Sequence, residues 1–279
     1  MKESCDTYFY EIARKLGVDR LKKTATKFGL GEKVLQETFS NEKKGLIPNT
    51  QWKKDNLGKG WVIGETLITG IGQGYMQTTP LQLCLMTAQL ANGGYKIYPK
   101  IIVNENDETY EETKAFITKN YNINKELKDG LVESSEGLFS FIKDKKHEAL
   151  YKNIENIKII QEAMFASTNE VRGTSYASRI EDPKYQFAGK TGTSQVKRIT
   201  EAQRELDLNT SEIPYDERDH ALYIAFGPYK KPRYALSIVI EHGGSGSSAA
   251  APLAKKLFKL IIDRHELREK VRNKKSVKI

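Results

Sequence analysis

Apolar residues recur every three or four positions in five stretches of the chain, and this spacing predicts five helices. Gly17 ends the first of them, and Asp19 is the expected N-cap of the second. The predicted helices span residues 7–16, 20–28, 80–92, 155–168 and 249–264. Their number and length indicate that helices make up much of the fold.

The third helix has the clearest start signal. Thr79 at the N-cap, Pro80 at N1 and Gln82 at N3 form a capping box. The G-x-G-x-G motif at 70–74, just before it, is typical of dinucleotide sites. Neither a strand–helix–strand unit nor an acidic residue at ribose distance follows, so the context excludes that function.

Strand patterns are concentrated late in the chain. Residues 221–227 and 233–241 are rich in β-formers and are joined across Pro228 and Pro232, which predicts a hairpin. Residues 186–196 form a further predicted strand, in which Gly192 marks the close approach of another backbone or a ligand. We expect these three strands to form an antiparallel sheet with the last helix on one face. A short strand is also predicted at 97–103.

The composition indicates a globular protein and argues against several classes of function. The 279 residues are 38% hydrophobic and 29% charged, with a formal charge of +9. A basic stripe interleaved with aromatics and a zinc-ligand spacing are both missing, which argues against nucleic acid. Only Cys5 and Cys84 occur, so a disulfide scaffold is excluded. No apolar stretch approaches the ~20 residues that span a bilayer, and the first residues do not resemble a signal peptide.

We expect one domain over residues 1–264, followed by a basic tail at 265–279 that is solvated and frays. Within the domain, residues 32–64 are loop-rich. Residues 104–152 are charged, rich in turn formers and without a clear period, which predicts an irregular surface excursion.

Two short motifs contain candidate chemistry. Lys190 supplies a positive charge beside Thr191 and Thr193, a combination that suits holding a carboxylate and stabilising an oxyanion. The alternative is an edge strand whose side chains face water. Ser4 and Asp6 lie just ahead of the first helix, where an ordinary helix cap is the alternative.

Together, these motifs and two later ones resemble the class B penicillin-binding proteins of the penicillin-binding protein 2 type, from residue 3 to about 262. The residues that carry the resemblance are Ser4-Cys-Asp6, Gly70-Ile-Gly-Gln-Gly-Tyr-Met-Gln-Thr-Thr-Pro-Leu-Gln82, Lys190-Thr-Gly-Thr193, Asp219-His-Ala-Leu-Tyr223 and Glu241-His-Gly-Gly-Ser-Gly-Ser-Ser-Ala-Ala-Ala-Pro252. The resemblance implies an α/β fold of the α+β type. More specifically, it implies a partial serine β-lactamase/D,D-transpeptidase fold, with an antiparallel sheet and flanking helices.

The resemblance also implies a serine D,D-transpeptidase that cross-links peptidoglycan stem peptides of the D-Ala-D-Ala type and is acylated by β-lactams. The implied catalytic residues are Ser4, Asp6 and Lys190, and the implied substrate-binding residues are Thr191, Gly192 and Thr193. In these roles Ser4 relays protons, Asp6 orients the lysine or the substrate amide, and Lys190 supplies positive potential. The two threonines hold the terminal carboxylate, and the Thr193 N–H is an oxyanion donor.

No metal or organic cofactor is implied. Elongation-complex proteins are the implied partners of the parent protein, which is expected at the periplasmic face of the bacterial inner membrane. The chain itself shows no export signal, so we expect membrane contact only through an N-terminal anchor missing from this chain.

The order of the motifs departs from the family in one respect. The family places Ser-x-x-Lys ahead of Ser-x-Asp, and here three residues precede Ser4. Three other matches occur later, at Ser40–Lys43, Ser140–Lys143 and Ser194–Lys197, and we interpret each as chance. We therefore expect a C-terminal portion of a transpeptidase domain that lacks the N-terminal strands and the nucleophile helix and is inactive alone.

Two other functions remain open at this point. One is a pseudoenzyme that binds stem peptides or β-lactams without reacting. The other is a two-chain enzyme in which an upstream polypeptide supplies Ser-x-x-Lys and completes the sheet. The DNA sequence immediately upstream of Met1 would separate them.

Overall fold

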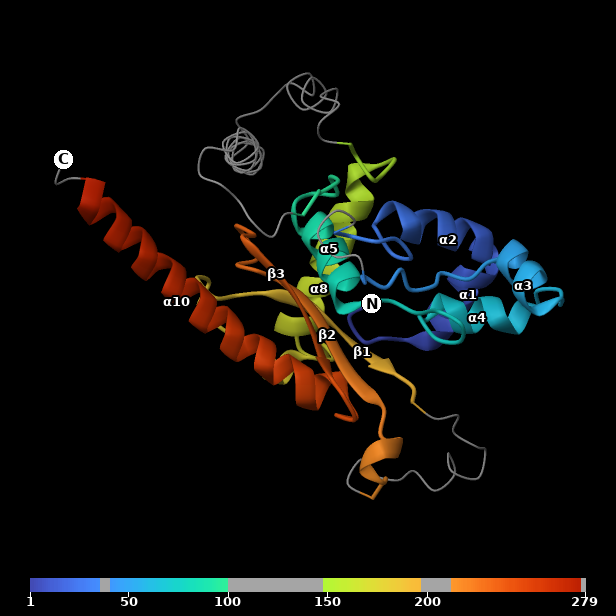
Figure 1. The fold of residues 1–279 in the computed structure, drawn as a ribbon. Helices are drawn as coiled ribbons and strands as arrows, with labels where there is room; N and C mark the ends of the chain where they lie inside the picture. Colours follow the sequence, from blue (N-terminus) through green and yellow to red (C-terminus); the bar gives the residue numbers. More distant parts are fainter. Residues whose placement is uncertain (36–40, 100–147, 197–211, 277–279) are drawn as a thin grey trace.

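A three-stranded antiparallel sheet lies at the centre of the computed structural model (Figure 1). The structure describes residues 1–35, 41–99, 148–196 and 212–276. The strands are β1 (Ala188–Ser194), β2 (His220–Gly227) and β3 (Tyr234–Ile240), in the order β1-β2-β3. The register pairs Ala188 with Phe226 and Ala225 with Leu236. The predicted antiparallel sheet is confirmed.

Helices cover both faces of this sheet (Figure 1). Alternate residues of β2 separate the two cores, because successive side chains of a strand point to opposite faces. Tyr223 and Ala225 pack with helix α10 (Ala251–Ser276). Phe226 packs with residues of α5 (Pro80–Ala91) and α8 (Ile154–Asn169) on the other face.

Helix α10 follows a π-helical turn at Gly246–Ala250 and is much longer than the sequence pattern predicts. Its apolar residues Ala251, Ala254, Phe258 and Ile262 are buried against the sheet. The prediction that the helix ends at Arg264 is wrong, because α10 continues to Ser276. Residues 265–276 consist largely of Glu, Leu, Lys and Arg, which have high helix propensity, and contain no Gly or Pro to stop the helix.

Four short helices form a separate group beside α5 (Figure 1). They are α1 (Asp6–Leu16), α2 (Val18–Lys27), α3 (Thr50–Leu57) and α4 (Ile63–Gly70). Helices α1 and α4 approach closely at Gly70, where a Cβ atom would lie 2.3 Å from the Cβ of Ala13. Helix α3 falls within the predicted loop at 32–64, and α4 begins at the end of that range and continues through residues for which no element was predicted. Because α3 is polar, its only sequence signals are its caps, Asn49 and Gly58.

Asp19 does not cap α2, so that prediction is wrong. Gly17 is the N-cap, and no side chain bonds the free N–H groups there. The Asp19 carboxylate instead accepts hydrogen bonds from the Thr50 N–H at 3.2 Å and the Thr50 hydroxyl at 3.0 Å. A residue that looks like a local cap therefore joins α2 to the start of α3.

Of the remaining predicted elements, one is confirmed and the others are absent or lie partly outside the described residues. The capping box of Thr79 and Gln82 at α5 is confirmed. Residues 97–99 are not in a strand, and 100–103 lie outside the described residues. Most of the predicted excursion also lies outside them, but its end at 148–152 joins the core through the buried Leu150. Over the described ranges, no helix combines the length and apolar character needed to cross a membrane.

Candidate active site

The first residues of the chain are held beside β1 by contacts with the turn that follows α8. Lys2 Nζ lies 2.8 Å from the Glu170 carboxylate, and the Glu3 carboxylate accepts from Arg172 at 2.8 Å. The Thr174 N–H donates to the Lys2 carbonyl at 3.3 Å. These contacts place Ser4 and Asp6, which follow directly, next to the predicted substrate-binding strand.

Ser4 and Asp6 do not cap the first helix. The N-cap of α1 is Cys5, and no side chain accepts a hydrogen bond there. Ser4 has a positive φ of 51°, which is uncommon for a residue other than glycine. Its Oγ atom is buried and makes no hydrogen bond within the described part of the chain. Strained backbone and unsatisfied buried polar atoms both occur preferentially at functional sites.

Lys190 projects from β1 into a largely desolvated position. Its Nζ donates to the Thr191 carbonyl at 2.8 Å and to Thr191 Oγ1 at 3.2 Å. Burial lowers the pKa of Lys190 from its usual value to about 8, and the negative charge of Asp6 opposes this shift. The structure thus brings Asp6 close enough to Lys190 for their charges to interact. A lysine with this pKa can gain or lose a proton near neutral pH.

A buried cluster of hydroxyl groups supports β1 from beneath. The Thr191 hydroxyl donates to Thr174 Oγ1 at 3.2 Å, and Thr174 in turn contacts the Ser167 hydroxyl at 3.0 Å. The Tyr223 hydroxyl lies 2.9 Å from Thr168 Oγ1, which also accepts from the Gly189 N–H at 3.1 Å. Because these groups satisfy one another, they fix both the backbone of β1 and the rotamer of Thr191.

Gly192 lies against a second backbone, as its place in the strand predicts. A Cβ atom on Gly246 would lie 2.7 Å from the Gly192 carbonyl oxygen and 2.3 Å from that of Leu222. The π-helical turn before α10 therefore approaches the sheet at the last residue of the Lys-Thr-Gly motif. Only glycine fits at residue 246 without displacing the strand.

Gln73 lies at the candidate site but was not among the residues predicted from the sequence. Its side-chain amide donates to the Thr193 carbonyl at 2.6 Å and so joins the 70–75 loop to β1. The G-x-G-x-G motif was the available signal, but it did not indicate where the loop would lie.

The contact also shows which edge of β1 faces away from β2. In an extended strand, the N–H and C=O of one residue point to the same edge, and those of its neighbours point to the opposite one.

The outer edge of β1 can be assigned from this rule. The Gly189 N–H, the Thr191 carbonyl and the Thr193 carbonyl are all bonded by groups outside the sheet. Alternate residues 189, 191 and 193 therefore face away from β2. It follows that the Thr193 N–H points toward the same outer edge as Lys190 Nζ and the Gln73 side chain.

A buried ion pair holds the loop that carries Gln73. Lys53 Nζ lies 2.5 Å from the Glu65 carboxylate, and the two side chains are only 7% and 18% exposed. Burial alone raises the pKa of Glu65, but hydrogen bonds from Lys53 and the Val62 N–H outweigh it and lower the pKa overall. Tyr75, two residues after Gln73, donates to the same carboxylate at 3.4 Å.

The two cysteines have opposite environments. Cys5 is exposed, and a contact of 3.1 Å between its Sγ and the Thr7 hydroxyl lowers its pKa. Burial raises the pKa of the half-buried Cys84, which lies under β3 with its Sγ 3.5 Å from the Ala235 carbonyl. Among the described residues, no group of three or more His, Cys, Asp or Glu side chains is arranged to hold a metal.

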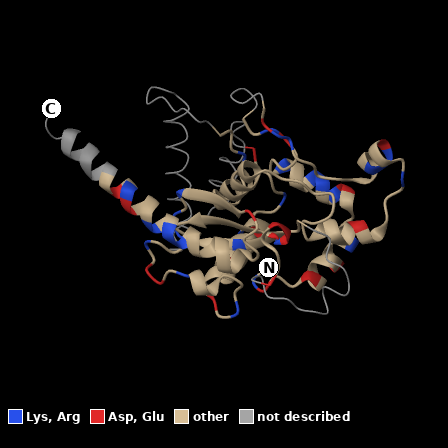
Figure 2. Ribbon diagram, turned by 60° about the horizontal axis from the view of Figure 1, so that its bottom comes forward, with Lys and Arg blue, Asp and Glu red and all other residues tan. Residues whose placement is uncertain are grey.

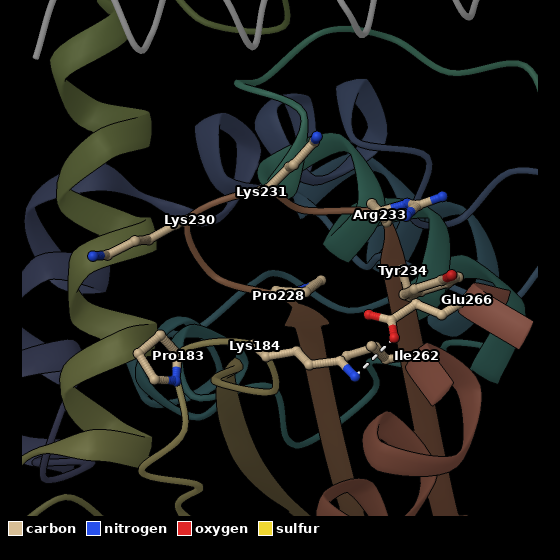
Figure 3. Close-up of a pocket in the computed structure, with 9 residues that line it drawn as sticks. All are labelled: Pro183, Lys184, Pro228, Lys230, Lys231, Arg233, Tyr234, Ile262 and Glu266. Atoms are coloured by element: carbon tan, nitrogen blue, oxygen red, sulfur yellow. Dashed lines mark hydrogen bonds and ion pairs between the residues drawn. The ribbon is translucent and has the colours of Figure 1, made fainter. Parts of the chain in front are cut away.

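A cavity of about 240 Å³ lies away from this site, at the turn between β2 and β3 (Figure 3). It is lined by Pro183, Lys184, Pro228, Lys230, Lys231, Arg233, Tyr234, Ile262 and Glu266. Figure 3 shows Lys184 directed to Glu266, a contact of 2.9 Å. Because the turn lies beyond the Ala188 end of β1, none of the predicted site residues reaches this cavity.

The other Ser-x-x-Lys matches cannot be placed as pairs. Ser40, Ser140, Lys143 and Lys197 lie outside the described residues. Ser194 is exposed at the end of β1.

The fold and this site define a class of protein. Residues 1–259 match the family model described as penicillin binding protein transpeptidase domain. The chain belongs to this family. Within the family it is of the penicillin-binding protein 2 type.

Similar proteins support this assignment. The chain is 32% identical over 263 residues to the peptidoglycan D,D-transpeptidase MrdA of Salmonella typhimurium, covering 94% of this chain and 37% of the relative. It is 33% identical to MrdA of Acinetobacter baumannii, covering 91% of this chain and 33% of that protein. The chain thus spans about a third of the length of these relatives.

Solved structures give the same result. A complex between the penicillin-binding protein PBP2 and MreC from Helicobacter pylori superposes with a TM-score of 0.68 at 27% identity, covering 95% of this chain and 39% of that one. Pseudomonas aeruginosa PBP2 in complex with WCK 5153 gives a TM-score of 0.64 at 31% identity, covering 91% and 46%. The predicted fold, a partial serine transpeptidase fold, is confirmed.

Proposed function

We propose that this chain forms the substrate-binding and proton-transfer part of a peptidoglycan D,D-transpeptidase. The observation that supports this most directly is the desolvated Lys190, with a pKa of about 8, held beside Thr191 and within the field of Asp6. Acyl transfer needs such a group, because protons move in both of its steps.

The first step joins a serine oxygen to the carbonyl carbon of the penultimate D-Ala residue and releases the terminal D-Ala as an amine. In the family, that serine belongs to the Ser-x-x-Lys motif. Its proton must reach the leaving nitrogen, and Ser4 and Lys190 are the groups in this chain that can pass it on. In the second step, the amine of another stem peptide attacks the ester, and the serine regains a proton.

The outer edge of β1 suits an extended peptide. A stem peptide that pairs with this edge would place its terminal carboxylate near Thr191, Thr193 and the positive charge of Lys190. The Thr193 N–H faces the same edge, as an oxyanion donor must. Losing one such donor typically costs about 3 kcal/mol of transition-state stabilisation.

Binding and acylation should be measured separately. The chain itself is titrated with diacetyl-L-Lys-D-Ala-D-Ala, and Lys190→Ala or Thr191→Val should weaken binding, whereas Cys84→Ala should not. Labelled penicillin is then added to a protein in which a relative's Ser-x-x-Lys segment precedes this chain. Lys190→Ala or Ser4→Ala should slow acylation by roughly 10²–10⁴.

The same experiments decide between the enzyme and the pseudoenzyme. Peptide binding without acylation, even with the Ser-x-x-Lys segment present, would favour a binding module. If Cys84→Ala slowed acylation as much as Lys190→Ala, the placement of the site would be wrong. For the chain alone we expect no covalent penicillin adduct, and an adduct mapped by mass spectrometry to any serine would overturn this. An adduct at Ser40, Ser140 or Ser194 would identify that Ser-x-x-Lys match as a real nucleophile.

A further inference from the structure

Helix α10 has a second apolar face that the domain does not cover. A surface helix ordinarily has one apolar stripe, directed at the core, and a polar opposite face. The core stripe of α10 is Ala251, Ala254, Phe258 and Ile262. On the outside, Leu253, Leu257, Leu260 and Leu267 are 38%, 39%, 65% and 64% exposed. Exposed leucines gathered on one face indicate an interaction surface.

The spacing of these leucines is that of a helix-pairing seam. The intervals are four, three and seven residues, and Arg264 occupies the missing position between Leu260 and Leu267. Positions 253, 257, 260, 264 and 267 are therefore consecutive a and d positions of a heptad repeat. We refer to these five residues as the outer seam.

The seam is narrow and its free charge is positive. Lys256 and Arg264 are exposed and form no ion pair with any residue that the structure describes. Asp263, also beside the seam, is already bound by Lys184 at 3.1 Å and by the Tyr185 hydroxyl at 2.5 Å. A lipid surface needs a wider apolar face, and it would meet Arg264 in the middle of this one. A single helix fits better.

Ile262 is the last residue of α10 in the core that the described side chains form. The helix continues fourteen residues beyond it and extends past the sheet (Figure 1). An isolated helix of this length is marginal in water. Lys and Arg recur along the coloured part of α10 (Figure 2). In the sequence, residues 264–276 contain six Lys or Arg against two Glu.

We propose that the outer seam of α10 binds an amphipathic helix of a partner protein that carries acidic side chains beside its apolar stripe. Charge complementarity selects this partner over a second copy of the chain. Two copies paired in parallel would set Arg264 against Arg264, and each chain has a formal charge of +9. An acidic helix would instead neutralise Lys256 and Arg264 while covering the leucines.

A pair of synthetic peptides tests the proposal on the whole chain. One is a three-heptad helix of about 21 residues with Leu at its a and d positions, except for a Glu opposite Arg264, and Glu at the flanking positions. The other has Lys in place of every Glu. Binding is measured by fluorescence anisotropy. The acidic peptide should bind at least about tenfold more tightly, and the difference should shrink as salt rises from about 50 to about 300 mM.

Variants of the seam make the test specific. Arg264→Glu should reverse the preference between the two peptides, and Leu260→Ser should weaken both. Val171→Ser, which changes an apolar residue that is 67% exposed elsewhere on the surface, should change neither. Circular dichroism checks that each variant is folded.

Three results would overturn the proposal. They are equal binding of both peptides, an unchanged preference in Arg264→Glu, and the absence of binding. Self-association that Leu260→Ser abolishes would assign the seam to a second copy. Sedimentation with phosphatidylglycerol vesicles that Leu260→Ser abolishes would assign it to a lipid surface.

Discussion

The lowered pKa of Lys190 makes the candidate site less stable than it would be with an ordinary lysine. A lysine that ionises less readily in the folded state than in the unfolded chain opposes folding at any pH at which the unfolded chain would hold the proton. Its hydrogen bonds to Thr191 recover only part of this cost. The proton-transfer role proposed for Lys190 would account for a residue that the fold itself does not need.

The pH dependence of unfolding should reveal this cost. The folded pKa of Lys190 is about 8, below the usual value of 10.5, so the unfolded chain binds more protons between these values. The contribution of Lys190 to the free energy of unfolding should therefore become more favourable as pH rises through this window. Below pH 8 its full cost applies. We expect Lys190→Met to be more stable than wild type at pH 7, by up to about 3 kcal/mol, and this advantage to shrink toward pH 10.

Urea denaturation of both proteins from pH 6 to 10 measures this difference. Lys184→Met, a change at an exposed lysine paired with Asp263 and Glu266, is the matched control and should not become more stable than wild type at pH 7. A constant difference between wild type and Lys190→Met across the whole range would contradict the assigned pKa.

At the scale of elements, the sequence predicts what is encoded locally. The capping box of α5, the β2–β3 hairpin and the Lys-Thr-Gly strand all follow from neighbouring residues. The contact of Gln73 with Thr193 joins residues 120 positions apart, and no local pattern predicts it. Helix α3 was missed because it is polar and short. The end of α10 was predicted at Arg264 because the apolar spacing of residues 249–264 does not continue beyond it, whereas the helix does.

The ion pair between Lys53 and Glu65 should contribute to the free energy of unfolding although it lies away from the sheet. Tyr75 binds the same carboxylate next to the Gln73 loop. Lys53→Met leaves Glu65 partly buried without its cation. We expect a loss of about 2 kcal/mol in the free energy of unfolding, below the ~3–5 kcal/mol of a fully buried pair. The double variant Lys53→Met/Glu65→Leu should recover most of it. Thermal denaturation of the three proteins would show this, and equal losses in the single and double variants would argue against it.

At the scale of the whole molecule, the described part of the sheet ends at an unpaired strand edge. Within the described ranges, β3 pairs with β2 alone, and each of its seven residues is only partly buried. Its sequence, Tyr-Ala-Leu-Ser-Ile-Val-Ile, is apolar and uncharged. An edge of this kind is a template for pairing with another chain.

We therefore expect the chain to self-associate and to be rescued by a polypeptide that supplies the family's N-terminal strands. Amide hydrogens of 234–240 should exchange faster than those of 220–227, which lie between two strands, and adding the upstream segment in trans should slow them. Size-exclusion chromatography and hydrogen exchange would measure both effects. A clean monomer with strong protection across 234–240 would show that another part of the chain covers this edge.

The contrast between the two thiols gives this protein a natural attachment point for a dye. Because the thiolate is the reactive form, a maleimide at neutral pH should modify the exposed Cys5 well before Cys84. A fluorophore at Cys5 would sit between Ser4 and Asp6 in the sequence, close to Lys190. If the proposed function holds, its emission should change when a stem peptide is added, and the wild-type chain would then report the occupancy of the site without any engineered cysteine.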